Sequence, residues 1–198
     1  HTYKKKIKVA NHHIYDLASL TKILATLPLL MKEFDDNSIK MESKMAELLP
    51  KLENTNKSNL TIRAVLSHYA KLTPWIPFYK ETLDENFYPK RKYFRSYIKN
   101  KYRIPVTNNL YLKSTFLEEI DEMIIDSPLL DSLYYKYSDL SFYLFKDYLE
   151  NKHGKPLDIL SNDKFFEPLG LKRTLFKPLA VIPENEIVPS EFDRYFRH

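Results

Sequence analysis

The sequence contains no cysteine and only two glycines among its 198 residues. The lack of cysteine excludes disulfide bonds and thiol catalysis, but it does not fix the compartment, since many exported proteins have none. Long apolar runs are also missing. The longest uncharged stretch of the most apolar segment, residues 23–31, is too short to cross a bilayer. We therefore predict no transmembrane segment, and we find no signal peptide in this chain.

The residues that are present can bury one sizeable core, because 43% of them are hydrophobic, and we predict a single globular unit. The net charge of +5 is mild. It would suit acidic partners or a cell-wall polymer, although such a charge is more often only a solubility feature. His12, His13 and His153 have no ligand partners at metal-binding spacing, so we predict no metal site and no cofactor.

The chain is organised around residues 16–22 and the helix that they open. Apolar residues recur at helical spacing over residues 20–34, and further apolar residues flank them. This pattern predicts a largely buried central helix that is kinked at Pro28.

Ser19 lies at the start of this helix, where free backbone N–H groups favour a developing negative charge. Lys22 lies one turn further along, beside Ser19. A lysine on a buried, apolar helix is costly unless it is paired or loses its proton. Lys22 is therefore a candidate base for Ser19. In the simpler alternative, Ser19 only caps the helix and Lys22 extends to water.

The Ser-x-x-Lys pattern by itself is weak evidence, because it occurs three times in this chain: at Ser19/Lys22, Ser96/Lys99 and Ser161/Lys164. The second lies in a basic, aromatic-rich stretch and the third beside Asn162 and Asp163, so we expect both serines at the surface. Only Ser19 opens an apolar helix.

Other segments give a coarse map of the fold. Thr61 is expected to cap a helix that has His68 at its far end, and Ser138 or Asp139 to cap a later one. The remaining predictions are strands at residues 2–9, 104–106, 110–112 and 174–176 and helices at residues 41–52, 115–125 and 156–160.

Residues 73–113 mix aromatic and basic side chains. Such a stretch can stack on single-stranded nucleic acid and neutralise it, and a binder using residues 78–103 would lose affinity steeply with salt. No recognition-fold signature accompanies it, so we predict no nucleic-acid partner. An insertion at about residues 76–110 explains the same residues. Within it, we expect residues 76–103 to form an ordered flap whose rings partly pack on the body near Ser19.

Four segments occur in an order that resembles the β-lactamase-related serine hydrolases, which include penicillin-binding proteins, class C β-lactamases and esterases. They are DLASLTK, LTIRAVLSH, YKYSDLSFYLF and FFEPLGLKRTLF. The resemblance implies an α/β fold of the β-lactamase/transpeptidase-like type, represented here mainly by its helices. It implies Ser19 as the acylated nucleophile, with Lys22 and Tyr137 sharing its proton. His68 matches a structural histidine of the family, and Lys71 stands where that pattern has glycine.

Two features depart from the family pattern. The second motif, Tyr-Ser/Ala-Asn, matches Tyr137, Ser138 and Asp139, which makes Ser138 and Asp139 the implied substrate-binding residues. An aspartate cannot donate the hydrogen bond of the asparagine amide, which weakens the case for β-lactam or peptide recognition. The third motif, Lys-Thr-Gly or His-x-Gly on a strand that also supplies an oxyanion-hole N–H, is absent from this chain.

The resemblance implies an exported serine hydrolase that acts through an acyl-enzyme on an ester, amide or β-lactam-like substrate, either a small molecule or a cell-wall-type peptide. The alternative is a catalytically silent binding or accessory module, in some relatives attached to a glycoside hydrolase. We also expect residues 1–198 to be a partial domain that is inactive alone. Sheet edges and one side of the central helix would then be uncovered in this chain. We expect another copy of the chain, a partner segment or residues of the parent protein to cover them.

Overall fold

The computed structural model describes residues 7–107 and 109–190, and these form two compact units. Among the described residues, unit 1 contains residues 7–43 and 142–190, and unit 2 contains residues 44–141. The assignment of residues 1–198 to one domain stays a prediction. None of the helices in the described part combines the length and the apolar character that a membrane crossing needs.

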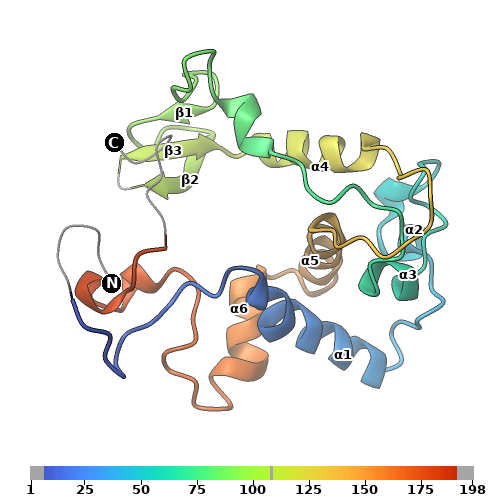
Figure 1. The fold of residues 1–198 in the computed structure, drawn as a ribbon, viewed down its shortest axis with the longest axis horizontal. Coiled ribbons are helices and arrows are strands. Elements are labelled where there is room, and N and C mark those ends of the chain that lie inside the picture. The colour runs from blue at the N-terminus through green and yellow to red at the C-terminus, as the bar shows by residue number, and fades with distance from the viewer. Residues whose placement is uncertain (1–6, 108, 191–198) are drawn as a thin grey trace. The chain divides into compact units, whose positions relative to one another are not determined.

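Unit 1 is built from helices and helical turns (Figure 1). They are the 3₁₀ turn Ala18–Leu20, the π turn Lys22–Thr26, α1 (Leu27–Asp35), most of α5 (Leu140–His153), α6 (Leu157–Ser161), the π turn Asn162–Phe166, and the 3₁₀ turns Pro178–Ala180 and Glu184–Glu186. Its buried apolar side chains come mainly from α1, α5 and α6: Leu29, Leu30, Leu144, Phe145, Tyr148, Leu149 and Leu160. Unit 1 therefore has a core made by helix packing.

Unit 2 combines short helices with a small antiparallel sheet. Its elements are α2 (Met45–Leu48), the 3₁₀ turn Pro50–Leu52, α3 (Ile62–Leu66), the 3₁₀ turn Phe78–Thr82, β1 (Phe94–Arg95), β2 (Tyr102–Thr107), β3 (Leu110–Lys113) and α4 (Phe116–Asp126). The strand order is β1-β3-β2, and Leu112 of β3 lies opposite both Phe94 and Ile104. Strands β1 and β2 lie within residues 76–110, the range of the predicted insertion, and β3 begins at its end.

The aromatic residues of the insertion pack on α4, which lies beside the sheet (Figure 1). Tyr93 and Phe94 are buried, and the Tyr93 ring centroid lies 5.0 Å from that of Phe116 at the start of α4. The Tyr93 hydroxyl donates to Glu119, 2.8 Å away. These two rings therefore pack on the helix that follows the insertion. The predicted position of the flap near Ser19 stays a prediction.

The segment after Ser19 is helical, but it is not the regular, largely buried helix that the periodicity predicted. In its π turn the Leu27 N–H donates to the Lys22 carbonyl, five residues back. Pro28 has no N–H to give to the usual partner four residues back, which explains why the hydrogen-bond register shifts directly before it. The burial prediction is wrong for one side, where the following residues are exposed: Leu20, Ile23, Leu24 and Met31. This exposed side matches the expectation that an apolar side of the helix is uncovered in this chain.

Most of the other predicted elements are confirmed. Thr61 Oγ1 accepts the Ala64 N–H at 3.2 Å and so caps α3. The strands at 104–106 and 110–112 and the helices at 115–125 and 156–160 lie within β2, β3, α4 and α6 or overlap them. Residues 41–52 contain two short helical pieces instead of one helix.

Two strand predictions are wrong. Residues 174–176 form no strand. They follow a turn in which the Thr174 N–H donates to the Leu171 carbonyl at 3.1 Å. Residues 7–9 form no strand either, and the rest of the segment 2–9 lies outside the described residues.

The two other Ser-x-x-Lys serines differ in burial. Ser96 is exposed, as predicted. The surface prediction for Ser161 is wrong, because this residue is fully buried and its hydroxyl donates to the Leu157 carbonyl at 2.7 Å. Its polar neighbours Asn162 and Asp163 continue the helical turn, so Ser161 itself falls on the inner face.

Lys57 is a fully buried lysine in unit 2. Its Nζ donates to three neutral oxygens: Asn56 Oδ1 at 2.9 Å, the Ile125 carbonyl at 2.9 Å and the Ser127 carbonyl at 2.6 Å. Two of these carbonyls lie at the C-terminal end of α4, where a cation is favourable. Burial lowers the pKa of Lys57 to about 8, although the charge of Asp126 raises it in part.

We expect the stability of unit 2 to increase as the pH rises from about 8 to about 10.5. In this range the unfolded chain keeps the Lys57 proton and the folded chain releases it, so the folded state gains up to about 3 kcal/mol. The measurement is urea unfolding at several pH values, compared between the unmodified chain and Lys57→Met, which cannot titrate. Lys44→Met, at an exposed lysine, is the control and should keep the slope. The same slope in Lys57→Met would contradict the prediction.

Candidate active site

Ser19 lies in a tight, strained turn of unit 1. Asp16 Oδ1 accepts the Ala18 N–H at 2.8 Å, and the Leu17 carbonyl accepts the Leu20 N–H at 2.8 Å. Between them Ala18 has φ of 43°, a left-handed conformation that costs a residue other than glycine about 1–2 kcal/mol. Strain of this kind is concentrated at functional sites. The turn leaves Ser19 exposed.

Lys22 contacts Ser19 directly. Its Nζ donates to Ser19 Oγ at 3.0 Å, and the same nitrogen lies 5.7 Å from the centroid of the half-buried Phe142 ring. A distance of 3.0 Å is within reach of proton transfer. When Lys22 is a neutral amine, the same geometry allows its nitrogen to accept the serine hydroxyl proton.

The segment with Tyr137, Ser138 and Asp139 lies in unit 2. Ser138 is buried; its hydroxyl donates to the Thr73 carbonyl at 2.7 Å and accepts the Leu140 N–H at 3.2 Å. The predicted cap at the start of α5 is thereby confirmed for Ser138. The Asp139 N–H donates to the Pro74 carbonyl at 2.8 Å. These bonds fix the backbone around Tyr137, whose side chain is 41% exposed.

His68 joins α3 to the Tyr137 segment. Its carbonyl accepts the Lys136 N–H at 2.9 Å, and its Nδ1 accepts the Ser138 N–H at 3.3 Å. Its ring centroid lies 4.7 Å from that of Tyr137. The sequence predicted a structural histidine but not these contacts, because nothing in its spacing links residues about 70 positions apart.

Lys71 has φ of 58°, in the left-handed region. This is the position where the family pattern has glycine, which adopts such angles without steric cost. The Lys71 carbonyl accepts the Leu130 N–H at 2.7 Å, and its Nζ donates to the Asp131 carbonyl at 2.9 Å. The loop therefore keeps the glycine-type backbone with a lysine side chain.

The structure thus brings Ser19 and Lys22 together in unit 1 and the Tyr137, Ser138 and Asp139 segment together in unit 2. The meeting of Tyr137 with Ser19 stays a prediction, as does substrate binding by Ser138 and Asp139. Within residues 7–107 and 109–190, no group of three or more His, Asp or Glu side chains is placed to hold a metal ion.

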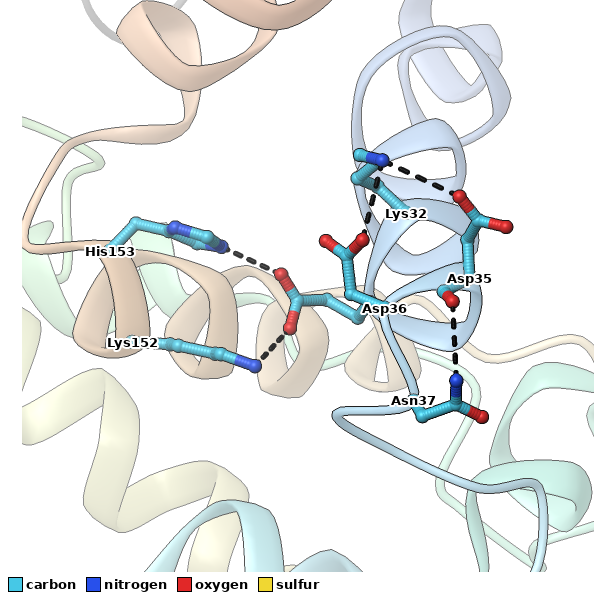
Figure 2. Close-up of polar contacts among 7 residues, drawn as sticks. Lys32, Asp35, Asp36, Asn37, Lys152 and His153 are labelled. Atoms are coloured by element: carbon cyan, nitrogen blue, oxygen red, sulfur yellow. Dashed lines mark hydrogen bonds and ion pairs between the residues drawn. The ribbon is translucent and has the colours of Figure 1, made fainter.

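A buried charge cluster in unit 1 escaped the sequence analysis. Glu33 of α1 is only 3% exposed, and three side chains of α5 contact its carboxylate: Lys152, His153 at 2.8 Å and the Tyr148 hydroxyl at 3.3 Å. Figure 2 shows Lys152 and His153 pointing toward this carboxylate from one side. The cluster fastens α5 to α1, which continues the segment that carries Ser19 and Lys22. The only signal in the sequence is an acidic residue inside an apolar helical pattern.

Opposing effects act on Glu33. Burial raises the pKa of its carboxyl group, but the hydrogen bonds from Lys152 and His153 outweigh burial and hold the pKa below its usual value. Burial likewise opposes the charge of Lys152, but the contact with Glu33 leaves the pKa of Lys152 raised. Both directions indicate an ionised pair. By contrast, Lys32 on the same helix contacts Asp35 and Asp36 at 3.4 Å in exposed positions (Figure 2).

Comparison with known proteins agrees with these motifs. The family model described as Beta-lactamase matches residues 2–185. The chain is 24% identical over 182 residues to the N-acetylmuramyl-L-alanine amidase of Bacillus subtilis (strain 168), a match that covers 89% of this chain and 36% of that protein.

Solved structures are similar in fold. The chain matches a class C beta lactamase from Rhodobacter sphaeroides with a TM-score of 0.59 and 18% identity, over 93% of this chain and 42% of that one. It matches a beta-lactamase/D-alanine carboxypeptidase from Yersinia pestis with a TM-score of 0.54 and 19% identity, over 84% and 42% of the two chains. The chain therefore spans well under half the length of the proteins that it resembles.

Proposed function

Because this chain belongs to the beta-lactamase family, we propose that it carries the nucleophile and the base of a serine hydrolase that acts through an acyl-enzyme. The observation that supports this most is the 3.0 Å contact between Ser19 Oγ and Lys22 Nζ, in a strained turn that leaves the serine exposed. A nucleophile and its base within hydrogen-bond reach are the usual sign of covalent catalysis.

The proposed reaction has two halves. Lys22, as the neutral amine, takes the hydroxyl proton while Ser19 Oγ attacks the substrate carbonyl carbon. The proton then passes through the Tyr137 hydroxyl to the leaving group, whose bond to the carbonyl carbon breaks and leaves an acyl-serine. Water then attacks the carbonyl carbon of the acyl-serine while its proton goes to the same base. The bond from this carbon to Ser19 Oγ breaks, Oγ takes the proton back from the base, and the acid product leaves.

For the substrate we propose an amide or ester of the cell-wall type, in the cell envelope. The support is the printed names of the similar proteins, an amidase and a carboxypeptidase. Asp139 argues for a changed recognition site, because a carboxylate accepts hydrogen bonds where the family's asparagine also donates one. We therefore expect weaker recognition of a substrate carbonyl at this position.

The alternative function is a catalytically silent binding module. Asp139 favours it, while Ser19, Lys22 and Tyr137 oppose it. The two functions differ in one measurable property, covalent modification of Ser19.

We expect a fluorescent fluorophosphonate or penicillin to label the natural full-length protein, and Ser19→Ala to abolish the labelling. Ser96→Ala is the matched control, since Ser96 is an exposed serine with its own lysine three residues on. It should label like the unmodified protein. Labelling that persists in Ser19→Ala would refute the proposed nucleophile, and no labelling of the unmodified protein by either reagent would favour the silent module.

A further inference from the structure

We infer that His68 is a positioning residue that holds the Tyr137 segment through a neutral imidazole. The inference rests on the proposed function, in which Tyr137 passes the proton to the leaving group. It assigns His68 no chemistry on the substrate; His68 acts only by fixing where the backbone and ring of Tyr137 lie.

The contacts of His68 enclose Tyr137 on both sides along the chain. The His68 carbonyl accepts the N–H of Lys136, directly before Tyr137. The His68 Nδ1 accepts the N–H of Ser138, directly after Tyr137. The imidazole also stacks at a tilt of 47° on the Tyr137 ring. His68 therefore fixes both the backbone around Tyr137 and the position of the Tyr137 ring.

The backbone of His68 makes these contacts possible. Helix α3 ends at Leu66, and His68 adopts φ of 59°, in the left-handed region. This conformation is uncommon for residues other than glycine, although histidine adopts it more often than most, and it turns the chain sharply after the helix. Its conformational cost is consistent with a residue held for its side chain at this place.

The hydrogen bond also fixes the form of the imidazole. Because the Ser138 N–H is the donor, Nδ1 must present a lone pair, and in the neutral ring the proton lies on Nε2. The segment before Tyr137 needs such an anchor, since residues 131–136 are exposed and lie outside helices and strands.

The test separates the acceptor from the ring. His68→Phe keeps an aromatic ring against Tyr137 but has no acceptor for the Ser138 N–H. His68→Asn tolerates the left-handed backbone and keeps an acceptor but loses the ring. His12→Phe, at an exposed histidine in unit 1, is the control. Circular dichroism of each variant checks that it is folded.

The first readout is hydrogen exchange of the Ser138 amide, which does not depend on catalysis. We expect His68→Phe to speed this exchange about tenfold, as for the loss of one hydrogen bond, and His68→Asn to change it less. Unchanged exchange in His68→Phe would overturn the inference. This measurement decides it even if Ser19→Ala shows that the proposed nucleophile is wrong.

The second readout is the rate of Ser19 labelling in a double-mutant cycle with Tyr137→Phe. We expect His68→Phe to slow labelling about tenfold when Tyr137 is present and to have no further effect in Tyr137→Phe. A purely structural role would slow both backgrounds by the same factor. That additive result would overturn the role of His68 in positioning Tyr137.

Discussion

Replacing Lys22 by methionine is expected to slow the labelling of Ser19 by about 10²- to 10⁴-fold. Methionine has nearly the shape of the lysine stem and suits a half-buried helical position. Packing should therefore be kept while the amine nitrogen that contacts Ser19 Oγ is lost. A serine without a base reacts slowly, because its hydroxyl is a weak nucleophile at neutral pH.

The measurement is the second-order rate of fluorophosphonate labelling on the natural full-length protein. Lys99→Met is the matched control, because Lys99 stands three residues after the exposed Ser96 as Lys22 does after Ser19. The control should react at the unmodified rate. If Lys22→Met reacts as fast as the control while Ser19→Ala does not react, Ser19 would be the nucleophile with another base.

Glu33→Ala should destabilise unit 1 by about 2–4 kcal/mol at pH 7. Removing a buried carboxylate leaves Lys152 and His153 without their partner and leaves a cavity between α1 and α5. We place the effect below that of a fully buried pair because the side chains of Lys152 and His153 are 33% and 30% exposed and can reach water. Glu33→Gln keeps the shape of the side chain and should lose less stability. It provides a second variant if Glu33→Ala does not fold.

The pH dependence of this loss follows from the direction of the pKa shifts. The pKa of Glu33 is lowered in the folded state, so its stabilisation is complete above the unfolded value of 4.5 and disappears as the pH falls through the folded pKa. Urea unfolding should therefore show a smaller difference between Glu33→Ala and the unmodified chain at pH 3 than at pH 7. Glu167→Ala, at an exposed position of unit 1, is the control and should change stability by less than about 0.5 kcal/mol. A difference that does not depend on pH would exclude the ionised pair as its cause.

Local features of this protein could be predicted from its sequence, because neighbours along the chain determine them. Ser19 and Lys22 are three residues apart on a helical segment, so their contact follows from helix geometry alone. The caps at Thr61 and Ser138 follow from the preference of small polar residues for helix starts.

Contacts between distant residues could not be predicted in the same way. Lys57 binds carbonyls about 70 positions away, and Glu33 binds side chains about 120 positions away. A single sequence shows that these residues are charged, but not that they are buried. Their burial depends on which helices pack together, and that information is spread over the whole chain.

The central helix shows a related limit. Its periodicity indicates which side chains are apolar, and Leu29 and Leu30 are indeed buried. The same pattern cannot tell what covers the other side, where Ile23 and Met31 are exposed. The spacing of apolar residues shows which side of a helix is apolar, but whether that side is buried depends on which other element packs on it.

The π turn before Pro28 amounts to one extra residue in the helix. Each residue of an α-helix turns the chain by about 100°, so deleting one residue from Lys22–Thr26 and restoring a regular helix would rotate Ser19 by about that angle around the axis of α1. The direction in which the serine faces is thus set by a count of residues. A single codon lost in this segment would therefore redirect the Ser19 hydroxyl, the proposed nucleophile, while leaving every side chain of α1 in place.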